Sequence, residues 1–194
     1  MKKKFLSWLL ITAIAFSLVA CSGTTEEPAT EETTEEGSIE VDENLLTMEI
    51  TVPAEFIEGT TQEELDIAVK ENGFKSAVIN EDGSATYVMT KGAHKKYMAQ
   101  LKEEMDKALN ELVGSDDYPN YTEIKTNENF TSFSITTKSS ELTFEESFSV
   151  LVFYMYGGLY NAFNGTPVDN VHVDFVNADS GEIISSSDSK DMAE

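Results

Sequence analysis

The sequence predicts an α+β fold for a single domain over residues 45–187, and three observations lead to that prediction. Strand-like runs occur in pairs, and single segments with a helical apolar period separate the pairs. Thr-x-x-Glu capping boxes mark helix starts at Thr61 and Thr143. The expected order is β-α-β-β-α-β-β-α-β-(β). This order favours an antiparallel or mixed sheet with about three helices mostly on one face.

The first strand and the first helix of this domain have clear ends. Apolar and polar residues alternate from Met48 to Val52, as in a strand with one buried face, and Pro53 ends that strand. The capping box at Thr61 opens a helix. Gly73 closes this helix, because glycine readily adopts the left-handed conformation in which many helices end.

A hairpin and a long helix are expected next. The Asp82-Gly83 dipeptide joins two β-rich runs, residues 74–80 and 85–90, and this combination is a strong hairpin signal. An amphipathic helix is then expected over residues 93–113, and Gly114 ends it. Its apolar stripe is formed by Tyr97, Leu101, Met105, Ala108 and Leu112.

The second half of the domain has the same alternation of strands and a helix. Residues 121–126 and 130–137 have strand character. The capping box at Thr143 opens a helix that extends over the apolar segment 148–163. That segment is hydrophobic nearly all round, which indicates burial on more than one side.

The domain ends in a last strand and a short tail. A strand begins at Val171, a turn follows over residues 177–181, and residues 183–184 are expected to pair back on that strand. The serine-rich acidic residues 188–194 are expected to fray, as chain ends often do.

Residues 1–20 have the three parts of a secretory signal peptide. Three lysines precede an apolar run from Phe5 to Val19, which is shorter than the roughly 20 residues that a membrane span needs. The segment Leu18-Val19-Ala20-Cys21 resembles the lipobox of bacterial lipoproteins. That resemblance, which covers residues 1–23, implies that Cys21 carries a diacylglyceryl lipid and becomes the first residue after cleavage.

The cysteine content favours lipidation over simple cleavage after Ala20. Cys21 is the only cysteine in the chain, and a lone thiol is a liability in an oxidising compartment. Two acyl chains suffice for stable anchoring. We therefore expect a protein held at the extracytoplasmic face of the cell membrane by the lipid on Cys21.

Acidic residues dominate the chain, which has 36 Asp and Glu, no Arg and a net charge of −23. Lysine as the sole strongly basic residue is typical, by analogy, of low-GC Gram-positive bacteria. Residues 22–44 contain nine acidic residues and no basic one, so residues 21–44 are expected to form a disordered acidic tether. A surface this acidic repels nucleic acid, which excludes nucleic-acid binding.

No residue pattern predicts a catalytic, metal or cofactor site. The two histidines, His94 and His172, lack the spacing of a zinc site, and no serine lies in a G-x-S-x-G motif. Two acidic turns, residues 80–83 and 177–182, are better explained as hairpin turns than as calcium loops. A glycosidase carboxylate pair drawn from distant segments would leave no trace in the sequence.

Two sets of residues are candidates for a partner surface. The first is a basic stripe on the long helix, formed by Lys91, Lys95, Lys96, Lys102 and Lys107. Its alternative is a solvated helix face that pairs with Glu103, Glu104 and Asp106. The second set consists of tyrosines that line a groove beside Gly157 and Gly158, and its alternative is a core helix. These tyrosines are Tyr154, Tyr156 and Tyr160.

The favoured function is a membrane-anchored lipoprotein whose domain is a non-enzymatic binding module for a cell-envelope protein or a wall polymer. The anchor, the tether and the missing catalytic motifs support this interpretation. A single-domain carrier of a small ligand is one alternative. A cell-wall hydrolase that uses an unrecognised carboxylate pair is the other.

Overall fold

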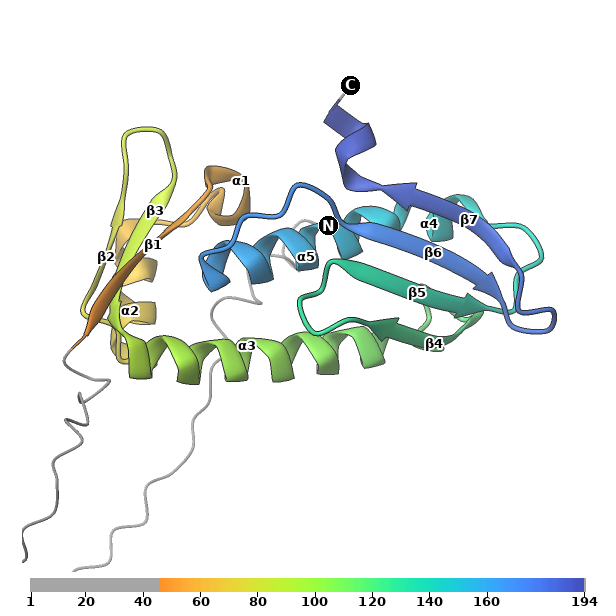
Figure 1. Cartoon of the computed structure of the whole chain (residues 1–194), viewed down its shortest axis with the longest axis horizontal. Helices are drawn as coiled ribbons and strands as arrows, with labels where there is room; N and C mark the ends of the chain where they lie inside the picture. Colours follow the sequence, from red (N-terminus) through yellow and green to blue (C-terminus); the bar gives the residue numbers. More distant parts are fainter. Residues whose placement is uncertain (1–45, 194) are drawn as a thin grey trace, which may run out of the picture.

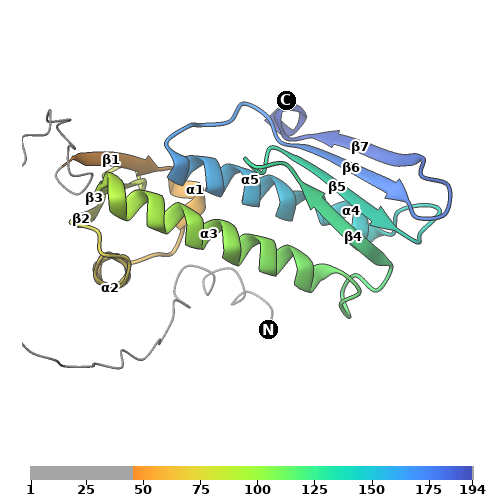
Figure 2. The same cartoon turned by 60° about the horizontal axis from the view of Figure 1, so that its bottom comes forward.

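The computed structural model describes residues 46–193, so the predicted signal peptide, Cys21 and the predicted tether lie outside the described residues. Two β-sheets lie toward opposite ends of an elongated molecule (Figures 1 and 2). Helices α3 (Lys91–Leu112) and α5 (Val150–Asn164) extend from one sheet toward the other. This architecture confirms the predicted α+β class.

The three-stranded sheet is antiparallel, with the order β1-β3-β2. Its strands are β1 (Thr47–Val52), β2 (Ser76–Ile79) and β3 (Ala85–Thr90). In register, Ile50 lies opposite Tyr87, and both side chains belong to the buried face of the sheet. The sheet therefore has one face in the core and one face of mixed, mostly polar residues toward solvent.

Helix α2 (Gln62–Asn72) closes the outer edge of β2. The Gln62 side-chain amide donates to the carbonyl oxygen of Ala77 at 2.8 Å and accepts from the backbone N–H of Ile79 at 3.1 Å. These two bonds satisfy backbone groups that an edge strand otherwise leaves open to another chain. The predicted capping box at Thr61 is present at the start of this helix.

The four-stranded sheet is mixed, with the order β4-β5-β6-β7. Its strands are β4 (Tyr121–Thr126), β5 (Ser132–Thr137), β6 (His172–Asn177) and β7 (Ile183–Asp188). Strands β5 and β6 are parallel, and the other two pairs are antiparallel. A parallel pair needs a crossover connection, which α4 (Phe144–Phe148) and α5 provide between β5 and β6. Helix α4 starts with the predicted capping box at Thr143.

The sequence predicts one sheet, and the structure has two. The length of α3 explains the difference. Its 22 residues span about 33 Å, whereas the six residues of β3 span about 20 Å. Strand β4 therefore begins well beyond β3 and starts a second sheet. A short additional helix, α1 (Ala54–Ile57), precedes α2.

The end of the chain is also more ordered than expected. Asp188 is the last residue of β7, and residues 189–193 form the short 3-10 helix η1 (Ser189–Ala193) instead of a frayed tail. The Ser189 hydroxyl accepts from the backbone N–H of Val171 at 2.8 Å, and the Ser189 N–H donates to the Val171 carbonyl at 2.9 Å. These bonds fix the tail beside the start of β6.

Two glycines let α5 lie close to its neighbours. A methyl group added at Gly157 would lie 2.5 Å from the carbonyl oxygen of Phe130, and one added at Gly158 would lie 2.5 Å from the ring atom Cζ of Phe56. These contacts occupy the space beside both glycines. Within residues 46–193, no helix has the length and apolar character needed to cross a bilayer.

Candidate functional site

The lysines of the predicted basic stripe do not share one face of α3. At about 100° per residue, Lys91, Lys95 and Lys102 point within about 40° of one another around the helix axis. Lys96 points about 100° away from Lys95, by the same geometry. The helix therefore distributes its positive charges over two sides.

The C-terminal part of this set is engaged in contacts within the domain. The Lys102 ammonium lies 3.7 Å from the Asp106 carboxylate and 4.9 Å from the centroid of the buried Phe130 ring. The Lys107 ammonium lies 3.9 Å from the carboxylate of Glu111. These intrahelical pairs are weak, because they are exposed to solvent.

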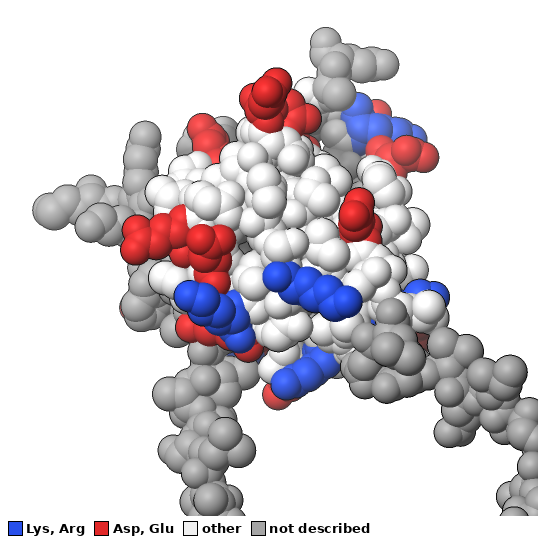
Figure 3. Space-filling view, turned by 90° about the vertical axis from the view of Figure 1, so that its left-hand side faces the viewer, with Lys and Arg blue, Asp and Glu red and all other residues white. Residues whose placement is uncertain are grey.

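The N-terminal part of the set is exposed. Lys91, Lys95 and Lys96 form no ion pair with another described residue. Figure 3 shows the end of the molecule at which β1, β2 and β3 lie, and the lysines visible there are separated by uncharged surface and have acidic side chains near them. This end of the molecule therefore carries separate positive charges within a mixed surface.

The tyrosines of α5 do not line a groove. Tyr156 is 8 % exposed, so it is buried and cannot belong to a partner surface. Tyr154 and Tyr160 are half-buried and pack against the core. The Tyr160 ring centroid lies 4.8 Å from that of Phe130. Because the space beside the two glycines of α5 is filled as well, this face of the helix belongs to the core.

His94 and the two acidic turns have structural roles. The His94 Nε2 atom lies 2.9 Å from the carbonyl oxygen of Phe163, near the end of α5. In the first turn, Asp82 accepts from both the N–H and the hydroxyl of Ser84. In the second, the Asn177 side chain accepts from two backbone N–H groups of its own turn. Both turns use these oxygens to stabilise themselves.

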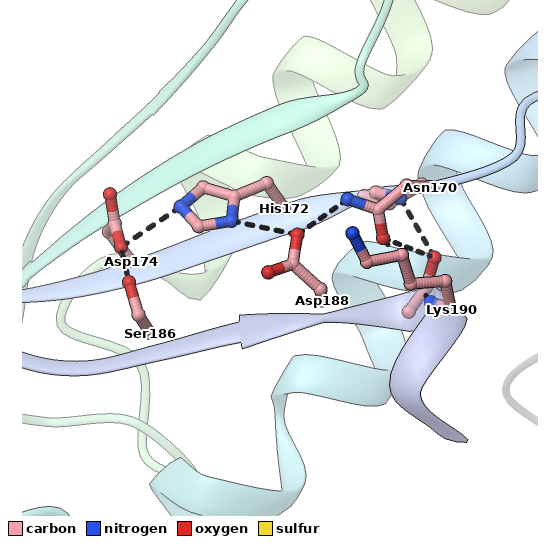
Figure 4. A network of polar contacts seen from close by, with 8 residues as sticks. Asn170, His172, Asp174, Ser186, Asp188 and Lys190 are labelled. Carbon is pink, nitrogen blue, oxygen red and sulfur yellow. Dashed lines mark hydrogen bonds and ion pairs between the residues drawn. The ribbon is translucent and has the colours of Figure 1, made fainter. Parts of the chain in front are cut away.

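His172 lies at the centre of a polar network on the solvent-facing side of the four-stranded sheet (Figure 4). Its Nδ1 atom lies 3.0 Å from the Asp188 carboxylate, and its Nε2 atom lies 3.1 Å from the Asp174 carboxylate. Asn170 donates to Asp188, and the Ser186 hydroxyl donates to Asp174. The network therefore links β6 to β7 through side chains as well as through backbone bonds.

This geometry favours a structural role for His172. The hydrogen bond that the His172 ring donates to the Asp188 carboxylate is the main cause that raises the pKa of His172 above its usual value, and the charge of Asp174 adds to it. Both ring nitrogens already face carboxylates. The Ser186 hydroxyl is directed at Asp174 and not at the imidazole, so the two do not form a nucleophile–base pair.

Stability is expected to fall as the pH rises through the folded-state pKa of His172. That pKa is raised, so the contacts stabilise the fold fully below the unfolded-state pKa of about 6.5 and are lost above the folded-state value. The effect should be modest, because the side chain is 36 % exposed. Urea-unfolding midpoints from about pH 6 to about pH 9 measure it.

Substitutions in the network identify the source of this pH dependence. His172→Asn should flatten the fall in stability, and Asp188→Asn should reduce it more than Asp174→Asn, because the Asp188 hydrogen bond is the main cause of the raised pKa. A fall that stays equally steep in the His172→Asn protein would contradict this role.

A further exposed surface, which the sequence did not predict, lies at α4. Three aromatic residues, Tyr118, Phe144 and Phe148, line a depression of about 360 Å³ at α4, and we call them the aromatic patch. Phe144 is 72 % exposed and Phe148 is 56 % exposed. Their ring centroids lie 4.5 Å apart. Leu151, three residues further along the chain in α5, is 39 % exposed and adds to the exposed apolar surface.

The third ring of the patch is fixed in place. Tyr118 stacks on the buried Tyr121 with ring centroids 4.8 Å apart and an angle of 6° between the ring planes. Its backbone N–H donates to the carbonyl oxygen and to the hydroxyl of Ser115, each at 3.1 Å. Tyr118 is therefore a preformed wall of the depression.

Two carboxylates, Asp117 and Glu145, complete the lining of this depression. Neither forms an ion pair with another described residue. Partial burial is the main cause that raises the pKa of Tyr118, and the charges of Asp117 and Glu145 raise it further. Both carboxylates therefore place negative charge close to Tyr118.

The spacing of the aromatic patch residues can be seen in the sequence. Phe144, Phe148 and Leu151 have the spacing i, i+4, i+7, which places them on one side of a helix. The neighbouring residues of α5 are also apolar, so the sequence pattern alone does not show which side faces solvent.

No family model, no curated protein and no solved structure matches this chain. Among residues 46–193, no group of three or more His, Cys, Asp or Glu side chains is arranged to hold a metal ion.

Proposed function

We propose that this chain is a membrane-anchored extracytoplasmic lipoprotein whose domain is a non-enzymatic binding module, with the aromatic patch as its binding surface. The supporting observation is the exposure of the adjacent rings of Phe144 and Phe148. Exposed apolar clusters with polar neighbours are typical of interaction sites. Aromatic side chains also provide a large share of the binding energy at such sites.

The position of the patch supports a partner in the cell envelope. The predicted tether would enter the domain at Leu46, ahead of β1. Helix α4 lies toward the other end of the molecule in both views (Figures 1 and 2). On a lipid anchor at Cys21, the patch could therefore be presented away from the bilayer. Asp117 and Glu145 would also be repelled by anionic lipid headgroups.

The proposal is tested by site-specific photocrosslinking of the full-length chain in cells. A photoreactive phenylalanine analogue at position 148 should give one reproducible adduct, because the patch would be in contact with its partner. The same analogue at position 183 is a matched control, since Ile183 is 59 % exposed but lies in β7. Phe144→Ser should abolish the adduct at position 148.

The anchor forms a second arm of this experiment. In cells supplied with an alkyne fatty acid, the chain should take up the label, and Cys21→Ser should remove the label and the adduct together. Ser22→Ala should retain both. Label on the Cys21→Ser protein would exclude the predicted anchor, and similar adducts at positions 148 and 183 would exclude the aromatic patch as the binding surface.

A further inference from the structure

We propose that the aromatic patch binds an organic ammonium group, that is, a positively charged nitrogen carried on an apolar stem. The inference rests on the proposed function and names the ligand class of the same surface. It follows from the combination of aromatic faces with unpaired carboxylates around one depression.

The rings provide the first half of the recognition. Cations are attracted to the faces of aromatic rings, and the apolar substituents of an organic cation pack against the same faces. Tyr118, Phe144 and Phe148 line the depression together. The two phenylalanine rings are tilted by 38° to each other, and Tyr118 is held by its stacking on Tyr121.

The carboxylates provide the second half. Asp117 precedes Tyr118, and Glu145 lies between the two phenylalanines in the sequence and lines the same depression. Neither is neutralised by a described lysine or histidine. A cation in the depression would therefore gain attraction from two negative charges at short range, where screening by salt is small.

The same features disfavour other occupants. The segment 22–44 of this chain contains nine acidic residues and no basic one, so the carboxylates of the patch repel it. Anionic ligands are repelled in the same way. Metal ions prefer several converging oxygen ligands, whereas this site offers two carboxylates among aromatic rings. An organic ammonium group can pack against the ring faces and is attracted to both carboxylates.

A pair of isosteres tests the charge requirement. Choline and its neutral carbon analogue 3,3-dimethylbutan-1-ol have nearly the same shape and differ in charge. The full-length chain in dodecyl maltoside is titrated with each, and the backbone amide NMR shifts of Phe144 and Phe148 are followed. We expect choline to bind with a millimolar dissociation constant and the neutral analogue to bind at least roughly fivefold more weakly. Nα-acetyl-lysine methylamide, titrated in parallel, distinguishes a quaternary from a primary ammonium source.

Substitutions in and outside the patch localise the binding. Phe148→Leu keeps an apolar side chain but removes the ring face, and Glu145→Gln removes one charge. Each should weaken choline binding several-fold without unfolding the domain, because both residues are exposed. Glu182→Gln, in the β6–β7 turn, makes the same change in net charge elsewhere and should leave binding unchanged.

Four contrary results have different meanings. Equal binding of choline and the neutral analogue at the patch would overturn the ammonium inference and leave the binding module in place. Equal weakening by Glu145→Gln and Glu182→Gln would also overturn it, because the attraction would then be a property of the whole acidic chain. An adduct at position 148 in cells without a shift by either ammonium probe would reject the ligand class alone. Absence of both the adduct and the shifts would reject the proposed function as well.

Discussion

Gly157→Ala is expected to destabilise the domain by about 3 kcal/mol and to lower its thermal midpoint by roughly 6–12 °C. The added methyl group would lie 2.5 Å from the Phe130 carbonyl oxygen and 2.5 Å from a methyl group of Val171. Alanine is intrinsically better than glycine in a helix by about 1 kcal/mol. Helix propensity alone would therefore make the variant more stable, whereas the steric clash is expected to make it less stable. Thermal unfolding followed by circular dichroism measures the change in stability.

The loop that carries Phe130 cannot easily move away from α5. Phe130 is completely buried and has a φ of 54°, a left-handed conformation that is uncommon outside glycine. The buried Asn161 side chain of α5 donates to the carbonyl oxygen of Asn129 at 2.7 Å. These constraints restrict movement of the backbone segment that carries the Phe130 oxygen.

Gly158→Ala is the matched control for this prediction. Its methyl group would meet the far end of the Phe56 side chain, which can rotate away, so the loss of stability should be smaller. Adding Phe56→Leu to Gly158→Ala should recover part of that loss, whereas the same addition should not rescue Gly157→Ala. A Gly157→Ala protein as stable as the wild type would show that the loop yields to α5.

The local signals in the sequence predicted local structure well. The capping boxes at Thr61 and Thr143 depend on four consecutive residues, and both are present. The hairpin between β2 and β3 depends on its turn residues and forms as predicted. Helix α3 begins two residues earlier than expected, because the Thr90 hydroxyl caps it by accepting from the Ala93 N–H.

Features that depend on distant segments could not be predicted in this way. The sequence places Gly157 beside a groove or in a core helix, but the close neighbour that requires a glycine there is the Phe130 loop, which lies 27 positions earlier. Strand periodicity places His172 and Asp174 on one face. Asp188, however, comes from a strand that was expected to end before it. The division into two sheets follows from the length of α3 and not from any strand pattern.

The candidate site illustrates the same limit. Phe148 begins the most apolar segment of the domain and Phe144 lies just before it, so both would be expected to be buried. Their exposure follows from the way in which α5 packs between the sheets. Helix α5 buries Phe153, Tyr156 and Phe163, whereas Phe144 and Phe148 of α4 remain uncovered.

Glu146→Ala is expected to reduce the free energy of unfolding by about 3 kcal/mol. Glu146 is only 3 % exposed, and its carboxylate accepts from the backbone N–H of Thr143 and from the hydroxyls of Thr137 and Ser139, each at 2.9 Å. Alanine would leave three donors without their acceptor: the hydroxyl of Thr137 at the end of β5, the hydroxyl of Ser139 just after it, and the Thr143 N–H. Urea denaturation of the wild type and the variant measures the difference.

A comparison of the two capping boxes of this chain separates the part of that loss due to helix capping from the part due to the bonds with Thr137 and Ser139. Glu64 has the same position after Thr61 that Glu146 has after Thr143, but its carboxylate bonds lie at the surface and involve Thr61 alone. Glu64→Ala therefore removes a helix cap and little else, so its effect should be clearly smaller than that of Glu146→Ala. Equal losses would mean that the bonds to Thr137 and Ser139 contribute nothing beyond capping. A larger loss for Glu146→Ala would instead show that this carboxylate holds α4, the helix of the aromatic patch, against the four-stranded sheet.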